Sequence, residues 1–583
     1  MCGIIGILKT NRSEETISEI VSALKKMEYR GYDSWGYAFI NDSLKLEKKS
    51  GRITQQSMKE KTIIGIGHTR WATHGGVTDQ NAHPHTDCKN EIAIIHNGII
   101  ENYLEIKNQL MEKGHKFRSE TDTEVIAHMF EEEHGNLLEK AKKVAMKLKG
   151  AFGIVAIDKN NTNEMVAIKH ECPIIVGVGK DRAIFASDPL AFLEYTNEAI
   201  FLEEGDIAYA KRNGTINFEF FNYLDNKKVD RKPKEISWKS EESELKGHPH
   251  YMLKEIMEQP KVMRKAIDLD VAKKMAGEMK GRKVIAIACG TARHAAIIGK
   301  HLLNRIAKYQ LEVMMAHEFT NFIDDLDAGT LILAVSQSGE TADVLECVRK
   351  AKKRGLDILS IVNVPSSTLA RESKIVFNTN CGPEIAVAST KAFTNQVMAF
   401  YQIAFEMKGI SPELEGIIKI LEDNMVYFDE KAKEVAEYLK TKQHVYMLGK
   451  GVNLAMALEG ALKLKEISYI HAEGMPSGEL KHGTLALIEK GTPVLLLCPT
   501  DYTYSDSINN GLETRARESF LIGMSDKQHP SFDIWIKLPK LENDIFYPLL
   551  EAIPLQLIAY HSAVLLGRDV DKPRNLAKSV TVK

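Results

Sequence analysis

The first residues of the chain could form a nucleophile with its own base. Cys2 follows Met1, and Cys is small enough for an initiator Met to be trimmed. Trimming would place a thiol and a free α-amine on one residue. An α-amine with a pKa of roughly 7.7–8 can act as the general base for a neighbouring thiol. Seven Cys occur in the 583 residues, so Cys2 by itself is weak support for this chemistry.

A second group of residues could bind a phosphate. The run SQSGET at residues 336–341 follows an apolar strand at 330–335 and precedes a helix at 342–353. Backbone N–H groups at a helix start, together with Ser and Thr hydroxyls, form an anion site without Arg or Lys. The GxxxxGK[ST] pattern of nucleoside-triphosphate loops is missing, so a phosphate monoester fits better. A plain loop with a capped helix remains the alternative.

Two kinds of segment must position these residues. Up to about residue 225 the chain favours short strands with few helices, near residues 14–27 and 122–133, which indicates stacked sheets flanked by helices. A charged stretch over residues 226–247 is typical of a solvated linker. Beyond it, strand–turn–helix alternation indicates parallel sheets. The strands expected in the first block lie at residues 3–8, 62–68, 91–96, 151–158, 165–169 and 183–186.

The second block contains an internal repeat. Residues 282–308 align with 442–468, and residues 329–341 align with 491–503. A period of about 160 residues indicates two tandem copies of one α/β domain instead of a solenoid. The second copy has CPTDYT where the first has SQSGET, so we expect one anion site per chain, in the first copy.

Further motifs accompany Cys2 in a fixed order. They are YRGYDSWG (29–36), GHTRWATHG (67–75), NAHPH (81–85), IIHNGIIENY (94–103) and SETDTE (119–124). At these residues the chain resembles the glutaminase domain of the N-terminal-nucleophile (Ntn) amidotransferases. The resemblance implies an αββα sandwich, with Cys2 as nucleophile and an oxyanion hole made by the Asn97 side chain and the Gly98 N–H.

Glutamine offers an α-carboxylate, an α-ammonium and a side-chain amide. Arg70 can bind the carboxylate through paired hydrogen bonds, and Asp122 can hold the ammonium. The resemblance also implies roles for further residues. These are polar contacts from Thr73 and His74, a closing loop with His83, a channel gate at Trp71, and ordering of the nucleophile's end of the chain by Arg30. His68, His85 and His96 receive no role and are expected to be satisfied structural histidines.

The second block carries its own motifs. They are ACGT (288–291), PEIAVASTKAFT (383–394), LEGALKLKEISYIHAEG (458–474), GELKHG (478–483) and the terminal DKPRNLAKSVTVK (571–583). Here the chain resembles the sugar isomerase (SIS) domains, which are doubly wound parallel α/β domains that bind phosphosugars. As a whole the chain resembles the glutamine–fructose-6-phosphate aminotransferase (isomerising) family, the glucosamine-6-phosphate synthases. The expected domains are a glutaminase domain (1–225), a linker (226–247), two SIS domains (248–425 and 426–573) and a C-terminal tail (574–583).

This resemblance implies a coupled reaction at the head of hexosamine and UDP-N-acetylglucosamine biosynthesis. Ammonia from glutamine passes through an internal channel, condenses with fructose 6-phosphate, and isomerisation gives glucosamine 6-phosphate. Glu466 would move the proton between C1 and C2, His482 of a neighbouring subunit would open the ring, and Lys578 could form a Schiff base. The implied sugar-phosphate contacts are Thr291, Ser336, Gln337, Ser338, Thr341, Val387, Ser389, Lys463 and Ala577. One departure is Ala292, where the family usually has Ser.

Composition excludes other classes. The formal net charge is −2, from 77 Lys+Arg and 79 Asp+Glu, so no basic surface for nucleic acid or an anionic membrane is expected. No run approaches the roughly 20 apolar residues of a membrane span, and the apolar start lacks the basic flank of a signal peptide. The scattered Cys form no CxxC pair or Cys/His cluster, so we expect no disulfides, metal or cofactor, and a reduced cytoplasmic protein. A shared His482 would require at least a dimer, and a homodimer is expected.

Alternative functions remain open. Phosphoribosyl-pyrophosphate amidotransferases and asparagine synthetases share such a first domain. They would need an acidic phosphoribosyl motif or a Ser-Gly-Gly ATP-pyrophosphate loop, and the sequence has neither. A glutamine amidotransferase acting on a different phosphosugar is possible. A non-catalytic phosphosugar sensor is the alternative from another class, although it would not need Cys2, Glu466, His482 or Lys578.

Overall fold

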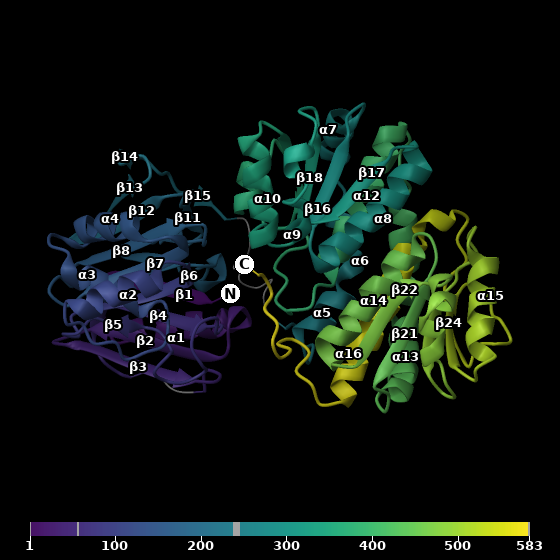
Figure 1. The fold of residues 1–583 in the computed structure, drawn as a ribbon, viewed down its shortest axis with the longest axis horizontal. Helices are drawn as coiled ribbons and strands as arrows, with labels where there is room; N and C mark the ends of the chain where they lie inside the picture. Colours follow the sequence, from purple (N-terminus) through teal and green to yellow (C-terminus); the bar gives the residue numbers. More distant parts are fainter. Residues whose placement is uncertain (1, 55–57, 237–244, 581–583) are drawn as a thin grey trace. The chain divides into compact units, whose positions relative to one another are not determined.

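The computed structural model describes residues 2–54, 58–236 and 245–580 (Figure 1). Its internal contacts divide the chain into two compact units. The first consists of Met1–Glu242 with Ser579–Lys583, and the second of Ser243–Lys578. Met1 and part of the expected linker lie outside the described residues, so the trimming of Met1 stays a prediction.

Two antiparallel sheets form the centre of the first unit, coloured purple to blue in Figure 1. One has the strand order β15-β11-β9-β10-β1-β4-β2-β3 and the other β14-β13-β12-β8-β7-β6-β5. All six strands expected from the sequence are present. The strands are β1 (Gly3–Ser13), β2 (Ser34–Ile40), β3 (Leu44–Ser50), β4 (Thr62–Arg70), β5 (His85–Thr86), β6 (Ile92–Ile100), β7 (Gly150–Asp158), β8 (Glu164–His170), β9 (Ile175–Val178), β10 (Arg182–Ala186), β11 (Glu198–Phe201), β12 (Asp206–Asn213), β13 (Thr215–Asn222), β14 (Lys227–Val229) and β15 (Lys234–Glu235).

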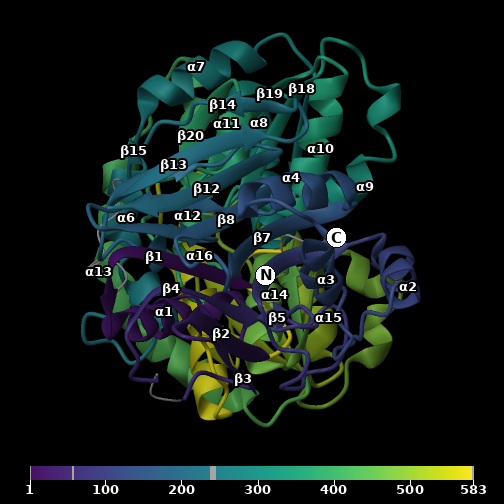
Figure 2. The same ribbon diagram turned by 90° about the vertical axis from the view of Figure 1, so that its left-hand side faces the viewer.

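Three apolar cores separate the layers of this unit, which Figure 2 turns toward the viewer. Because side chains alternate along a strand, neighbouring Ile4 and Ile5 of β1 face opposite ways. Ile4 lies in the core between the two sheets, and Ile5 lies in the core under α1. The third core packs the other helices on the second sheet, which confirms the predicted αββα sandwich. The helices are α1 (Glu15–Lys26), α2 (Tyr103–Glu112), α3 (Glu124–Glu132) and α4 (Leu137–Lys147).

The stretch expected to be a linker contains two short strands. β14 pairs with β13 through Val229 and Lys228, and β15 pairs with β11 through Glu235 and Lys234. The two sheets of the first unit therefore extend to residue 235, ten residues past the expected boundary at 225.

The second unit contains two five-stranded parallel sheets, with the orders β17-β16-β18-β19-β20 and β22-β21-β23-β24-β25. The two orders are equivalent, which confirms the tandem repeat read from the sequence. The strands are β16 (Val284–Ala288), β17 (Leu311–Met315), β18 (Leu331–Ser336), β19 (Asp357–Val362), β20 (Ile375–Asn378), β21 (His444–Gly449), β22 (His471–Pro476), β23 (Pro493–Leu497), β24 (Phe520–Ser525) and β25 (Ile534–Lys537).

Helices cover both faces of each parallel sheet. On β16, Ala286 lies in the core with α8 and α12, whereas Ile285 lies in a separate core with α10. The core around Ala286 also contains Met447 of β21, so the two copies of the repeat share one apolar interior. The helices are α5 (Tyr251–Met257), α6 (Gln259–Lys265), α7 (Leu269–Met279), α8 (Gly290–Ala307), α9 (Ala316–Phe319), α10 (Ala342–Lys353), α11 (Thr368–Glu372), α12 (Lys391–Lys408), α13 (Leu414–Leu439), α14 (Asn453–Ser468), α15 (Tyr504–Arg515) and α16 (Tyr547–Leu565).

One segment differs from the expectation about membrane spans. In the described part of the chain, Asp544–Leu565 is long and apolar enough to cross a membrane by length and composition. Within the structure, however, 83% of its apolar window is buried. The helix α16 lies in this segment and contributes Leu550, Ile553 and Leu557 to the shared core of the second unit. A buried core helix accounts for its hydropathy.

Candidate active sites

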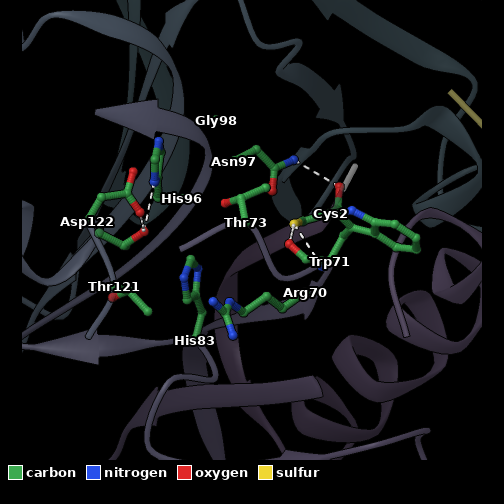
Figure 3. Close-up of a pocket in the computed structure, with 11 residues that line it drawn as sticks. Cys2, Arg70, Trp71, Thr73, His83, His96, Asn97, Gly98, Thr121 and Asp122 are labelled. Carbon is green, nitrogen blue, oxygen red and sulfur yellow. Dashed lines mark hydrogen bonds between the residues drawn. The ribbon is translucent and has the colours of Figure 1, made fainter. Parts of the chain in front are cut away.

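A pocket in the first unit gathers most of the residues expected to bind glutamine (Figure 3). The ends of strands and helices position them. Cys2 immediately precedes β1, Arg70 is the last residue of β4, and Asn97 lies in β6. The loop before α3 supplies Asp122. The lining residues are Cys2, Arg70, Trp71, Thr73, His83, His96, Asn97, Gly98, Thr121, Asp122 and Thr123.

The Cys2 thiol is held beside the backbone of Trp71. The Trp71 N–H donates a hydrogen bond to Sγ at 3.1 Å, and Sγ lies 3.6 Å from the Trp71 carbonyl oxygen. The next residue is also fixed, because the Gly3 N–H donates to Thr69 Oγ1 at 3.0 Å. Burial raises the pKa of the Cys2 thiol above its ordinary value. The thiol is therefore neutral at pH 7, and it needs a base before it can attack.

A chain of hydrogen bonds orients Asn97. Its Nδ2 donates to the Cys2 carbonyl at 2.9 Å, and its Oδ1 lies 3.0 Å from His68 Nε2. The same Nε2 lies 3.0 Å from the His96 carbonyl oxygen. Both partners of Nε2 are acceptors, so the proton of the neutral His68 ring must be on Nε2. Burial lowers the pKa of His68 to about 3, which keeps the ring neutral.

Gly98 occupies a position that only Gly can hold. Its φ is +122°, and a Cβ built there would lie 1.9 Å from the Ala151 carbonyl oxygen on the paired strand β7. No side chain fits this close approach. Gly is therefore required at position 98 for the backbone conformation. The role of the Gly98 N–H as an oxyanion donor remains a prediction.

Arg70 and His83 lie next to each other in the pocket (Figure 3). The Arg70 guanidinium donates to the carbonyl oxygens of His74, Gly75 and Gly76 at 2.5, 3.2 and 3.2 Å, which ties down the loop after β4. The His83 ring stacks on His68 at 4.2 Å, and burial lowers the pKa of His83 well below its usual value. The pocket therefore presents one fixed cation beside neutral imidazoles.

Asp122 lies on the opposite side of the pocket in Figure 3. Its Oδ2 accepts a hydrogen bond from the Ile100 N–H at 2.8 Å, which fixes the carboxylate relative to the end of β6. The other oxygen, Oδ1, has one weak contact at 3.4 Å from the Thr123 hydroxyl. A carboxylate oxygen with spare acceptor capacity is what an ammonium ligand requires.

Two residues expected at the glutamine site are not among those that line the pocket. His74 contributes through its backbone carbonyl, which holds Arg70. Arg30 is buried and pairs with Asp188 at 2.5 Å. The neighbouring Ser187 accepts from the Ile4 N–H at 2.9 Å. Arg30 therefore acts on the segment beside β1, in agreement with an ordering role and not with direct contact to glutamine.

His68, His85 and His96, to which the sequence assigned no role, bond residues that line the pocket. His85 Nε2 lies 3.1 Å from Thr121 Oγ1, and His96 Nδ1 lies 2.9 Å from Thr123 Oγ1. The expectation that all three are fully satisfied is wrong. Among the described residues, Nδ1 of His68 and Nε2 of His96 are buried without a hydrogen-bond partner.

The SQSGET run forms a compact loop between β18 and α10. The Ser336 hydroxyl lies 2.9 Å from Thr341 Oγ1 and accepts from the Gly339 N–H at 3.0 Å. Ser338 Oγ accepts from the Glu340 N–H at 3.1 Å. Gly339 has a φ of +66°, which a turn this tight requires. The loop thus places hydroxyls and N–H groups at the start of a 12-residue helix, as the sequence predicted.

Lys463 lies fully buried on α14 among acceptors. Its Nζ lies 2.6 Å from Glu466 Oε2, 3.4 Å from Glu459 Oε1 and 3.0 Å from Thr291 Oγ1. Burial works to lower the pKa of Lys463, but Glu459 and Glu466 outweigh it, so the pKa is raised and the amine stays charged. Glu459 also bonds His294 on α8 at 2.7 Å. The sequence reading missed Glu459, although residues 459, 463 and 466 share one helix face.

The C-terminal tail is anchored in the second unit as far as Lys578. Lys578 Nζ pairs with Glu384 Oε2, and the side chain of Lys578 is only 5% exposed. Glu384 also accepts from the Ser389 hydroxyl at 3.0 Å and the Thr390 N–H at 2.9 Å. Nearby, the Val387 N–H donates to the Asp571 carbonyl at 2.9 Å. Glu384, which the sequence did not single out, therefore joins Lys578 and Ser389, two of the residues expected around the sugar.

The structure also places His482 and Ala292. His482 ends a short 3₁₀ helix, Glu479–His482, and is exposed. Its supply to a neighbouring subunit stays a prediction. Ala292 lies in the first turn of α8 and packs against the apolar core of the second unit, so its methyl group has a structural use.

Comparison with known proteins covers both units. Residues 68–194 match the glutamine amidotransferase domain family, and residues 279–405 and 438–566 match the SIS domain family. The chain is 43% identical over 610 residues to the glutamine–fructose-6-phosphate aminotransferase (isomerizing) of Thermococcus kodakarensis and 42% identical to that of Aquifex aeolicus, with full coverage of each chain. A solved C-terminal domain of glucosamine-fructose-6-phosphate aminotransferase from Francisella tularensis is 37% identical, with a TM-score of 0.53. It covers 57% of this chain and 100% of its own.

Proposed function

The chain belongs to the glutamine–fructose-6-phosphate aminotransferase (isomerising) family, and on that basis we propose how its residues divide the reaction. The enzyme converts glutamine and fructose 6-phosphate to glutamate and glucosamine 6-phosphate. The observation that carries this function is the 43% identity over the whole length of a relative with that activity in its name. The assignment of individual residues rests on the two sets of contacts described above.

In the first unit, Cys2 attacks the side-chain amide of glutamine and releases ammonia. An Asn side chain has two N–H donors, and Asn97 uses one on the Cys2 carbonyl, which leaves the other for the oxyanion. Arg70 has five N–H donors, of which three are directed at the loop carbonyls. The remaining donors can hold the α-carboxylate. Asp122 Oδ1 takes the α-ammonium, and Trp71 gates the path of ammonia to the second site.

In the second unit, the SQSGET loop and Thr291 hold the phosphate of the sugar. Glu466 transfers the proton between C1 and C2, and the charged Lys463 beside it favours the ionised base. Lys578 attacks the open-chain ketone through Nζ once its proton has passed to a base. Glu384, in direct contact with Nζ, is positioned to accept that proton.

The proposal also includes the assembly of the enzyme and its location in the cell. His482 is exposed in this chain, and we assign its role in ring opening to a neighbouring copy, so the proposed assembly is a homodimer. All seven Cys are free thiols in the structure, in agreement with a reduced cytoplasmic protein.

The test is to incubate the purified chain with glutamine and fructose 6-phosphate and to measure glutamate and glucosamine 6-phosphate. Cys2→Ala should abolish glutamate release and leave the isomerisation of fructose 6-phosphate measurable. Loss of both activities in a folded Cys2→Ala protein would show that the two sites are not separate. Mass spectrometry of the active protein should find Met1 removed, because a retained Met1 leaves Cys2 without its α-amine.

A further inference from the structure

Four side chains of metal-binding type converge in the first unit, and none of them lines the glutamine pocket. Cys88 lies in the turn between β5 and β6, and His115 follows α2. His128 and Glu131 lie one turn apart on α3. Each offers one ligand atom, and these four atoms all lie within 4.8 Å of one another.

The separations between these atoms match a tetrahedral centre. Zinc binds a thiolate at about 2.3 Å and nitrogen or oxygen at about 2.0–2.2 Å, which at a tetrahedral angle gives about 3.6 Å between S and N and about 3.4 Å between N and O. Cys88 Sγ lies 3.6 Å from Nδ1 of both His115 and His128. Glu131 Oε2 lies 3.2 Å from Nδ1 of His115 and 3.5 Å from Nδ1 of His128.

An outer carboxylate orients the imidazole of His115, and a second carboxylate lies near that of His128 without a hydrogen bond to it. His115 Nε2 bonds Glu132 Oε1 at 2.9 Å, and His128 Nε2 lies 3.7 Å from Glu124 Oε1. A carboxylate at Nε2 keeps the ring proton there and directs the Nδ1 lone pair to the opposite side. This arrangement of carboxylate, imidazole and ligand atom is the usual support of a metal-bound His. The Nδ1 atoms of both rings face Cys88 Sγ and Glu131 Oε2.

Burial makes these contacts unfavourable without a positive charge among them. The side chains of His115, His128 and Glu131 are 7%, 1% and 11% exposed. A buried set of lone pairs that face one another is disfavoured unless a proton or a cation lies between them. The Cys88 N–H already donates to Glu131 Oε2 at 3.1 Å. Protons on the thiol or the imidazoles are one way to satisfy the rest of the cluster, and a divalent cation is the other.

We propose that Cys88, His115, His128 and Glu131 bind one zinc ion. The combination of one sulfur, two imidazole nitrogens and one carboxylate oxygen favours zinc over magnesium or calcium, which prefer oxygen ligands alone. Four protein ligands complete a tetrahedron and leave no position for a reacting water, so the site is structural.

The site would stiffen one wall of the glutamine pocket. Cys88 lies three residues after His85, which contacts the pocket residue Thr121. The helix α3, which carries two of the ligands, begins directly after the pocket residues Asp122 and Thr123. Zinc would join these two segments behind the pocket without touching the substrate. Its removal is expected to loosen the binding of glutamine and to leave the second unit unaffected.

The experiment uses the full-length chain without a polyhistidine tag. Elemental analysis should find about one zinc per chain, retained in a moderate competition with a chelator. Cys88→Ser and His128→Gln should lose the ion, whereas the control His134→Gln, an exposed His in the same unit, should keep it. Cys2→Ala should also keep the ion, which excludes binding at the nucleophile. Cobalt in place of zinc should show a thiolate charge-transfer band that Cys88→Ser lacks.

A milder variant covers the case in which a ligand variant fails to fold. Glu132→Gln keeps all four ligands and removes one outer carboxylate, so the Kd for zinc should rise roughly 10-fold to 100-fold. Folded wild-type protein that binds zinc no more tightly than Cys88→Ser would overturn the proposal, and protonated histidines would then hold the cluster. Unchanged zinc affinity in both Cys88→Ser and Glu132→Gln would place the ion elsewhere. A different metal at these ligands would overturn the assignment to zinc.

Discussion

His68 is expected to support glutamine hydrolysis only through Asn97. In His68→Leu the hydrogen bond from Nε2 to Asn97 Oδ1 is lost, and with it the bond to the His96 carbonyl. Leu has a volume close to that of His and offers no donor. The amide of Asn97 can then rotate away from the position in which it donates to the Cys2 carbonyl and faces the reacting carbonyl.

The expected loss of kcat differs between removing the hydrogen bond that orients Asn97 and removing Asn97 itself. One neutral hydrogen bond contributes about 0.5–1.5 kcal/mol, so weaker positioning of Asn97 should lower kcat for glutamine hydrolysis about 2-fold to 10-fold. Direct removal of the oxyanion donor in Asn97→Ala should lower kcat about 100-fold to 1000-fold. His68→Leu also leaves a buried acceptor unsatisfied, which should reduce the free energy of unfolding by about 1–3 kcal/mol.

The assay is a double-mutant cycle on glutamate release, with fructose 6-phosphate isomerisation as the control activity. If His68 acts through Asn97, then His68→Leu should cause no further loss of kcat in the Asn97→Ala background. Multiplicative losses in the double variant would refute this reasoning, because they would mean that His68 contributes on its own. Urea unfolding of each variant separates a loss of folded protein from a loss of catalysis.

Two further predictions concern charge. Lys463→Met should cost about 3–5 kcal/mol of unfolding free energy, because it leaves the buried Glu459 and the half-buried Glu466 without their cation. It should also abolish isomerisation while glutamine hydrolysis continues. Adding Glu459→Gln should recover part of the stability in urea unfolding, and no recovery would contradict the ion-pair explanation. For glutamine hydrolysis, the raised pKa of the buried Cys2 thiol makes the reaction depend on the α-amine as base, so kcat/KM should fall as the pH drops below about 7.7–8 and the amine takes up a proton. A flat profile between pH 6 and 8.5 would show that another base serves Cys2.

The sequence predicted the fold best where hydrophobic patterning is strong. The apolar parts of β1, β4 and β7 and the central strands β16, β18 and β23 of the parallel sheets are of this kind. Several strands were missed, among them interior strands such as β2 and β12 and the strands at sheet edges. β3 has the sequence LKLEKKS and lies at the end of its sheet, and β14 and β15 are short and rich in Lys. Charged edge strands avoid pairing with other chains, and the same charges make them look like solvated loops.

The sequence predicted those candidate-site residues that lie in continuous motifs. The pocket around Cys2 and the loop at Ser336 are of this kind. Supporting residues could not be read in the same way, because their use depends on partners from distant segments. His68 matters through Asn97, and Glu384 through Lys578. The cluster of Cys88, His115, His128 and Glu131 has no short Cys/His spacing, so the expectation of no metal site missed the fact that three separate segments meet there.

The anchoring of Lys578 has a consequence for protein synthesis. Lys578 is made after both parallel sheets of the second unit, whereas all residues that line the pocket around Cys2 lie before residue 124. N-terminal domains generally fold first during synthesis, so the glutamine site can form while the sugar site still lacks its amine. A chain cut short at its C-terminus would then hydrolyse glutamine without making amino sugar, and Glu384 would stay buried without its cation. The contact between Lys578 and Glu384 therefore forms only in a chain that has been made as far as Lys578.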